Sequence, residues 1–154
     1  FKIYNSWFKE NIATLSFYAS SSNSLADKDI KLSERLSLPS NKLRGFEPGK
    51  IGPKDGDDFV GGNYATALTV ATSLPQILPG FQSADFLLFL DVANVWGVDY
   101  DSSLSDDSKI RSSLGLGIDW FTPIGPLNFS LTEIISKGDN DITESFRFNI
   151  GTTF

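Results

Sequence analysis

Along much of this chain, apolar and polar residues alternate with the period of two that is typical of β-strands. The clearest segment is ADFLLFLDVANVW, residues 84–96. One of its faces is apolar from Phe86 to Val92, whereas the other carries two acids. The apolar face consists of Phe86, Leu88, Leu90 and Val92, and the opposite face consists of Asp85, Leu87, Phe89, Asp91 and Ala93. This alternation predicts a long strand whose two sides meet different surroundings.

The same period recurs in residues 109–120, 127–134 and 144–154, with Gly, Pro and Asp between the segments. A helical period is hard to find anywhere in the sequence. We therefore expect an all-β fold with about six or seven antiparallel strands. They are expected near residues 1–8, 11–20, 63–73, 83–96, 108–120, 126–135 and 144–154.

Two all-β architectures fit this alternation. In a soluble sandwich the apolar face points into the core, whereas in a transmembrane barrel it meets lipid and the polar face lines the lumen. Strands of about 9–11 residues match the span of a tilted membrane strand. Aromatic residues at the expected strand ends fit an interfacial girdle. They are Trp96, Tyr100, Trp120, Phe121 and Phe154.

The connections between the expected strands also favour the barrel. They are short or of middling length at residues 9–10, 74–82 and 122–125. They are long, and acidic or rich in glycine, at residues 21–62 and 97–107, and residues 136–143 are a further connection on the same side as these two. Short turns on one side and long loops on the other are typical of outer-membrane barrels. With the C-terminus on the periplasmic side, the longer loops are expected outside the cell.

Composition narrows the function further. The 154 residues include neither Cys nor His, which excludes disulfides, thiol catalysis and His-activated nucleophiles. A net charge of −6 argues against a nucleic-acid partner. The acidic residues in 99–108 and 138–141 lack the spacing of an EF-hand, and neighbouring acids point apart, which suits no general acid–base pair. We expect no enzyme activity, no metal site and no cofactor.

Residues 43–63, LRGFEPGKIGPKDGDDFVGGN, contain a single Arg-Gly-Phe and six glycines, one of which is Gly45 of that motif. A phosphate-binding loop is disfavoured, because the segment lacks the GxxxxGK[ST] pattern and no helix follows it. Glycine also serves tight turns and close backbone approach, which a long loop needs when it folds back on itself.

Three sets of motifs, in order and sensibly spaced, resemble the BamA-type outer-membrane protein assembly factor family, also called the bacterial surface antigen family. LRGF (43–46), IGP (51–53) and VGGN (60–63) resemble its long sixth extracellular loop. DWFTPIGPLNFSL (119–131) resembles its strand-turn-strand motif, and FRFNIGTTF (146–154) resembles its final strand. The resemblance covers most of residues 40–154, whereas residues 1–39 match only in pattern.

The resemblance implies a fold and a place within it. Members of the family have a sixteen-stranded transmembrane antiparallel β-barrel behind periplasmic POTRA repeats. Residues 1–154 are then the C-terminal portion of one barrel domain, without the POTRA repeats and the N-terminal strands. The long loop, about residues 21–62, is expected to fold inward through the lumen.

The resemblance also implies roles for particular residues. The loop-tip motif is Leu43, Arg44, Gly45 and Phe46, and the lumen partner of Arg44 is Asp91, with Asp119 and Asp85 as second choices. The alternation of residues 84–96 independently assigns Asp91 to the lumen face. The strand-turn-strand motif comprises Trp120, Pro123, Gly125 and Pro126. The terminal strand, which borders a lateral gate in this family, comprises Phe146, Phe148, Ile150, Gly151 and Phe154.

The expected function is therefore that of an outer-membrane insertase, which folds and inserts β-barrel proteins by lateral seam opening and strand augmentation. Its expected partners are unfolded outer-membrane protein clients and outer-membrane lipid, with accessory assembly lipoproteins and periplasmic chaperones in the full-length parent. The expected location is the bacterial outer membrane. Two alternatives remain: a polypeptide transporter of the two-partner-secretion type from the same superfamily, and a passive porin or structural barrel.

Overall fold

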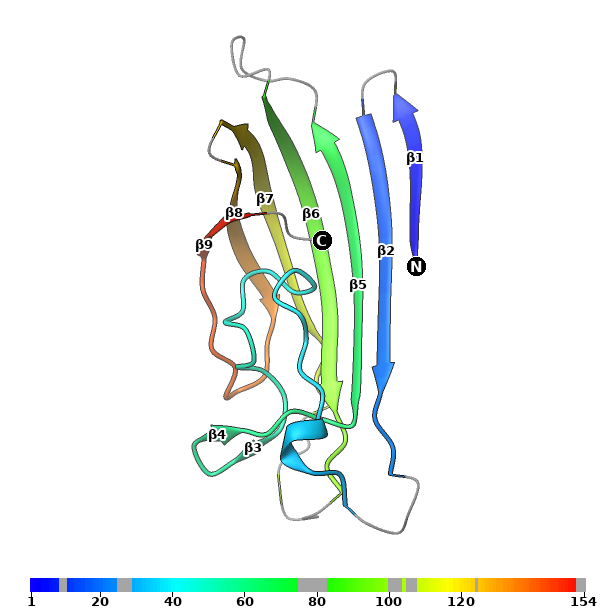
Figure 1. Cartoon of the computed structure of the whole chain (residues 1–154), viewed down its shortest axis with the longest axis vertical. Coiled ribbons are helices and arrows are strands. Elements are labelled where there is room, and N and C mark those ends of the chain that lie inside the picture. Colours follow the sequence, from blue (N-terminus) through cyan, green and yellow to red (C-terminus); the bar gives the residue numbers. More distant parts are fainter. Residues whose placement is uncertain are drawn as a thin grey trace.

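The computed structural model describes residues 1–8, 11–24, 29–74, 83–99, 104, 108–123 and 125–151. Seven strands form one antiparallel sheet in the order β1-β2-β5-β6-β7-β8-β9 (Figure 1). They are β1 (Lys2–Phe8), β2 (Asn11–Ser21), β5 (Tyr64–Leu74), β6 (Ala84–Trp96), β7 (Arg111–Thr122), β8 (Gly125–Ser136) and β9 (Phe146–Ile150). The predicted all-β, antiparallel fold is thus confirmed.

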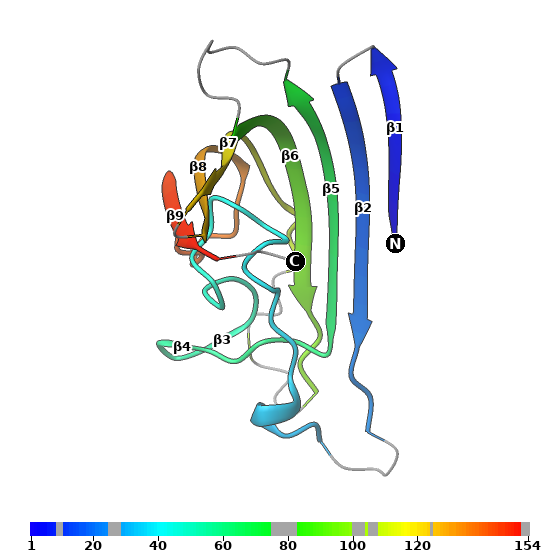
Figure 2. The ribbon, with the colours of Figure 1, turned by 45° about the horizontal axis from the view of Figure 1, so that its top comes forward.

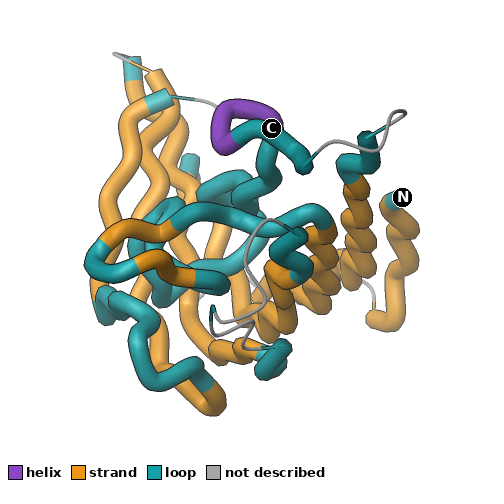
Figure 3. The backbone as a smooth tube through the Cα atoms, turned by 90° about the horizontal axis from the view of Figure 1, so that it is seen from below, coloured by secondary structure: helices purple, strands orange, loops and turns teal. Residues whose placement is uncertain are grey.

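The segment between β2 and β5 is the inward-folded loop, and it contains short elements of its own. These are the 3₁₀ turn η1 (Leu32–Glu34) and the paired strands β3 (Lys54–Asp55) and β4 (Asp58–Phe59). The sheet curves from β1 round to β9, and the loop lies on its concave side (Figure 2). Seen from below, the loop fills the space within the arc of strands (Figure 3). No helix among the described residues is long and apolar enough to cross a membrane.

The strand registers place the alternating residues on two faces of the sheet, as the sequence predicts. Leu88, Leu90 and Val92 of β6 pair with residues of β5 and β7 on the convex face, whose large apolar side chains are widely exposed. Among them are Phe17, Leu68, Val70, Leu88, Leu114, Leu116, Leu131, Phe146, Phe148 and Ile150. Such a continuous apolar surface is what a lipid-facing wall requires.

The hydrophobic core lies between the inward-folded loop and the concave face. From the loop it contains the buried residues Leu38, Leu43, Phe46 and Ile51. From β5 and β6 it contains Ala65, Ala67, Ala93 and Val95. Since three of these four sheet residues are alanines, the loop can approach the strands closely. The core therefore fixes the loop to the wall rather than joining two sheets.

The last strand, β9, is shorter than the sequence predicts, and two of the predicted girdle aromatics lie outside the described residues. The final strand was expected over residues 144–154, but β9 covers only Phe146–Ile150 within the described residues. It starts later because the Glu144 N–H donates to Gly45 O in the loop at 3.0 Å. It ends before Gly151, whose φ of +117° breaks the extended backbone. Tyr100 and Phe154, both expected in the aromatic girdle, lie outside the described residues.

Candidate functional site

The loop tip carries Arg44, which meets Asp91 of β6 in a two-pronged ion pair. Arg44 Nε lies 2.7 Å from Asp91 Oδ2, and Nη2 lies 2.9 Å from Oδ1. The Arg44 backbone N–H also donates to Asp91 Oδ2 at 3.1 Å. The Asp91 side chain is fully buried, whereas that of Arg44 is 20% exposed. A buried carboxylate with three donors is well satisfied, and the fork geometry fixes the orientation of the tip.

Arg44 makes two further contacts, one through its guanidinium and one through its backbone carbonyl. Its Cζ lies 3.3 Å from the centroid of the Phe89 ring, a close cation–π contact. The ring in turn covers Gly115 of β7, where a Cβ would collide with it. The Ser113 hydroxyl donates to the Arg44 carbonyl at 2.6 Å. Since Ser113 and Asp91 are cross-strand partners, two neighbouring strands hold the same loop residue.

The other residues of the tip explain why it is Arg-Gly-Phe. Gly45 has φ +88°, and a Cβ there would lie 2.6 Å from Thr132 Cγ2 and 2.7 Å from Ile134 Cδ1. No side chain fits between this backbone and β8. Phe46 is 2% exposed and Leu43 is 3% exposed, so both join the core. Their burial stabilises the inserted tip by roughly 1.5–3 kcal/mol each.

The two second-choice partners of Arg44 lie elsewhere on β6 and β7. Asp85 and Asp119 are cross-strand partners near the end of the sheet opposite the long loop. Asp119 accepts a hydrogen bond from Asn128 Nδ2 at 2.6 Å. It also lines a polar cavity of about 310 Å³ that Arg44 and Arg147 border from other sides. The carboxylate that the structure brings to Arg44 is that of Asp91.

The strand-turn-strand motif forms the tight connection between β7 and β8. Thr122 and Gly125 are its closing pair, and Thr122 Oγ1 donates to Gly125 O at 2.6 Å. Pro126 pairs with Phe121 and Trp120 pairs with Leu127. Pro123 lies at the turn and is exposed. The motif thus sets the β7–β8 register and lies away from the loop tip.

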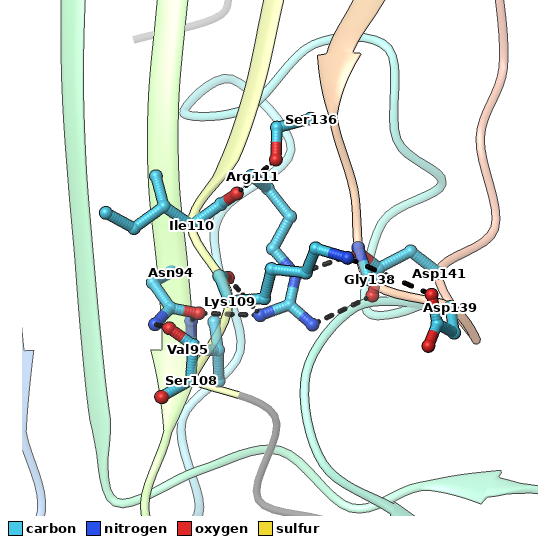
Figure 4. A network of polar contacts seen from close by, with 10 residues as sticks. All are labelled: Asn94, Val95, Ser108, Lys109, Ile110, Arg111, Ser136, Gly138, Asp139 and Asp141. Atoms are coloured by element: carbon cyan, nitrogen blue, oxygen red, sulfur yellow. Dashed lines mark hydrogen bonds and ion pairs between the residues drawn. The ribbon is translucent and has the colours of Figure 1, made fainter.

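Arg111 of β7 belongs to a second buried network, which sequence reasoning did not identify (Figure 4). Its Nε and Nη2 lie 2.8 and 3.1 Å from the carboxylate oxygens of Asp141, in the connection between β8 and β9. Its Nη1 donates to Asn94 Oδ1 at 2.6 Å. Asp141 also accepts from the Gly138 N–H at 2.6 Å. Both charged side chains are only 1% exposed.

A third arginine, Arg147 of β9, also contacts the loop. It was not identified as a site residue from the sequence. Its Nη1 donates to Ser40 O at 2.6 Å and its Nη2 donates to Phe46 O. It also pairs with the carboxylate of Glu144. The alternation of residues 146–150 assigns Arg147 to the lumen face, and a lone lumen-facing arginine was the available signal. Its acceptors, the carbonyls of Ser40 and Phe46, could not be predicted, because a pattern of side chains does not show which backbone groups come close.

The remaining residues of the terminal strand lie on the convex face or beyond the strand. Phe146, Phe148 and Ile150 are exposed there, and the Phe148 ring lies 4.9 Å from that of Phe129 on β8. Gly151 still donates its N–H to Pro126 O at 2.9 Å. Phe154, the terminal aromatic of the motif, is outside the described residues.

Near the far end of the loop, Arg35 forms a further ion pair with Asp99, just after β6. Arg35 Nη2 lies 2.7 Å from Asp99 Oδ1, and the Ile30 N–H donates to Asp99 Oδ2 at 3.3 Å. Burial opposes the ionisation of Asp99. The hydrogen bonds from Ile30 and Asn63 and the charge of Arg35 outweigh it, so the pKa of Asp99 lies below its ordinary value.

Comparison with known proteins agrees with this architecture. The model of the Omp85 superfamily domain matches residues 1–154. The outer membrane protein assembly factor BamA of Neorickettsia risticii is 32% identical over 117 residues, which cover 74% of this chain and 16% of that protein. BamA of Neisseria meningitidis serogroup B is 29% identical over 141 residues, covering 73% and 17%. A SAM50-like protein of Schizosaccharomyces pombe is 34% identical over 143 residues, covering 86% and 29%.

A solved structure gives the same result in three dimensions. The crystal structure of BamA from Haemophilus ducreyi lacking POTRA domains 1–3 superposes with a TM-score of 0.84 at 27% identity. The match covers 96% of this chain and 32% of that one. The chain thus spans less than a third of the length of each relative named here. The matched family model and these relatives show that the chain belongs to the Omp85 superfamily and is part of an integral outer-membrane β-barrel.

Proposed function

We propose that this chain is the C-terminal part of an insertase barrel that folds β-barrel proteins and inserts them into the outer membrane. The observation that carries the proposal is the loop tip, in which Arg44 is fixed to Asp91 on the concave wall. A passive pore does not need a loop anchored through its lumen. Relatives from two bacteria are named as assembly factors, which supports the same activity.

The proposed mechanism uses backbone pairing and no covalent chemistry or cofactor. Within the described residues β9 is an edge strand, because it pairs with β8 on one side only. An unpaired strand edge is a template for another strand. We propose that this edge receives a strand of an unfolded client at the seam of the closed parent barrel, and that Gly151 weakens the seam there. The anchored loop then keeps the wall in shape while the seam opens.

The partners follow from this mechanism. The clients are unfolded outer-membrane proteins, and the convex apolar face contacts membrane lipid. In the full-length parent, accessory assembly lipoproteins and periplasmic chaperones would deliver the clients to periplasmic POTRA repeats.

The test is reconstitution of the full-length parent in liposomes with a urea-unfolded barrel client. We expect the client to become folded and protease-protected at least tenfold faster than in protein-free liposomes, a difference of about 1.4 kcal/mol in barrier height. Arg44→Glu should reduce the rate to that of empty liposomes, because two carboxylates then face each other. Adding Asp91→Arg should restore part of the rate.

Other outcomes distinguish the alternatives. Transport of the polypeptide into the liposome without insertion would favour a secretion transporter. Flux of small solutes without any effect on the client would favour a porin. If the double variant were as inactive as Arg44→Glu, direct pairing of these residues would not be what the activity requires.

A further inference from the structure

The last strand of the sheet, β9, is held weakly by its neighbour. Its five residues pair with β8 opposite Leu127–Leu131, and one backbone hydrogen bond flanks them at each end, from Thr132 N–H to Ser145 O and from Gly151 N–H to Pro126 O, whereas β8 is 12 residues long. Within the described part of the chain, its other edge has no strand beside it. A short edge strand of this kind opens at low free-energy cost. Contacts outside the β8–β9 ladder therefore contribute much of what positions it.

The loop tip supplies such contacts through its backbone. Phe46 and Thr143 form an isolated antiparallel bridge, which places the tip beside the segment that leads into β9. The Glu47 N–H donates to Ile142 O at 2.9 Å, and the Ile142 N–H donates to Lys50 O at 3.1 Å. With the bond from Glu144 to Gly45, these contacts form a short ladder. The loop tip is thus hydrogen-bonded, through its backbone, to the segment that leads into β9.

Arg147 connects the same two segments through its side chain. The guanidinium donates to the carbonyls of Ser40 and Phe46, which lie before and after Arg44 in the chain. Its third partner is the carboxylate of Glu144, which lies in the lead-in to β9. The Arg147 side chain is only 10% exposed. A planar guanidinium can serve three acceptors at once, which a single ammonium on a flexible stem does less well.

We infer that Arg147 is a positioning residue that couples the inserted loop tip to the last strand, so that the two segments move as one unit. The side chain points into the concave space, and among the described residues no strand occupies the outer backbone edge of β9. An incoming strand can therefore pair with β9 while the tether is intact. Removing the Arg147 contacts, which form the tether, loosens β9 and the loop tip together. This inference rests on the proposed function only in its consequence, that the tether sets how readily the edge becomes available to a client strand.

The test is hydrogen–deuterium exchange of the full-length parent in lipid nanodiscs, with no client present. We expect Arg147→Gln to accelerate exchange about tenfold in residues 142–150 and in residues 43–50, because two carbonyls and a carboxylate lose a charged donor. Exchange in β5 and β6 should stay unchanged. Arg147→Lys should recover part of the protection in both segments, since it keeps the charge.

The matched control is Asn149→Ala, which removes the next lumen-facing polar group of β9 but leaves the guanidinium and its acceptors in place. It should leave both segments protected. Faster exchange in only one segment, or in neither, would overturn the coupling. Equal acceleration throughout β5 and β6 would also overturn it, because it would indicate general destabilisation.

The same variants distinguish this inference from the proposed function. If the wild-type parent fails to accelerate client folding in liposomes, the proposed function fails, whereas the exchange result still decides the coupling. If the wild-type parent folds clients but Arg147→Gln leaves both segments protected, the coupling fails and the proposed function stands.

Discussion

Two Arg–Asp pairs lie almost side by side on the concave face, and they are built in opposite senses. At the tip anchor (Arg44 and Asp91), the loop supplies the base and β6 supplies the acid. At the hairpin anchor (Arg111 and Asp141), β7 supplies the base and the β8–β9 connection supplies the acid. In both, the carboxylate receives two guanidinium bonds and one backbone N–H.

Burial separates the two anchors. Both partners of the hairpin anchor are 1% exposed, whereas Arg44 of the tip anchor is 20% exposed and borders the polar cavity. Water can therefore compete for the Arg44 guanidinium at the tip anchor, whereas it reaches neither partner at the hairpin anchor. An Arg–Asp pair that is fully buried therefore stays closed, whereas a pair that solvent reaches can open.

The largest effect is expected when the arginine of each anchor is removed. Arg111→Ala should destabilise the protein by about 3–5 kcal/mol, because Asp141 is left buried and unpaired. Arg44→Ala should cost less, about 1–3 kcal/mol, because removing the Arg44 side chain, which borders the cavity, would open a path for water to the buried Asp91 carboxylate. The measurement is the denaturant midpoint of each full-length variant in lipid. An equal or reversed ranking would show that burial does not distinguish the two anchors.

A smaller effect is expected at the glycine of the tip. Gly45→Ala should destabilise the inserted loop, because φ +88° is unfavourable and the Cβ would meet Thr132 and Ile134. Gly49→Ala is the matched control, since Gly49 has φ +72° but nothing lies within 4 Å of a Cβ there. The control should show only the backbone penalty, about 1–2 kcal/mol.

The readout for this pair is the rate at which added protease cleaves the loop, measured beside the denaturant midpoint. Faster cleavage of Gly45→Ala than of Gly49→Ala would isolate the contribution of close packing against β8. Identical behaviour would mean that the backbone conformation alone demands glycine at the tip.

The smallest effect concerns the third Arg–Asp pair, at the exposed end of the loop. The hydrogen bonds from Ile30 and Asn63, together with the charge of Arg35, lower the folded-state pKa of Asp99 from 3.8, so these contacts to the ionised carboxylate contribute fully above that pH. The contribution is lost as the pH falls through the lowered folded value. Hydrogen exchange in residues 30–36, corrected for intrinsic rates, should therefore rise as the pH falls below about 4, and more in the wild type than in Asp99→Asn. Loosening already complete at pH 5 would contradict the assignment.

Sequence patterns predicted the parts of this structure that depend on period and local turn chemistry. The alternation of residues 84–96 placed Asp91 on the concave face and Leu88 and Leu90 on the convex one, as the registers show. The family motifs implied the pairing of Arg44 with Asp91, which the structure brings within hydrogen-bond distance. The role of that pair in assembly stays a prediction.

The sequence alone determined the strand period, the two-faced character of the sheet and the glycine-rich nature of the long loop, because these follow from local backbone preferences. The tertiary structure decided which segments meet. Only folding brings Arg111 to Asp141, 30 residues away, and Arg147 to the Phe46 carbonyl, 101 residues away. Every residue has a backbone carbonyl, so the sequence does not show which carbonyl accepts a hydrogen bond. The strength of an ion pair depends on its burial, which a local sequence pattern does not give.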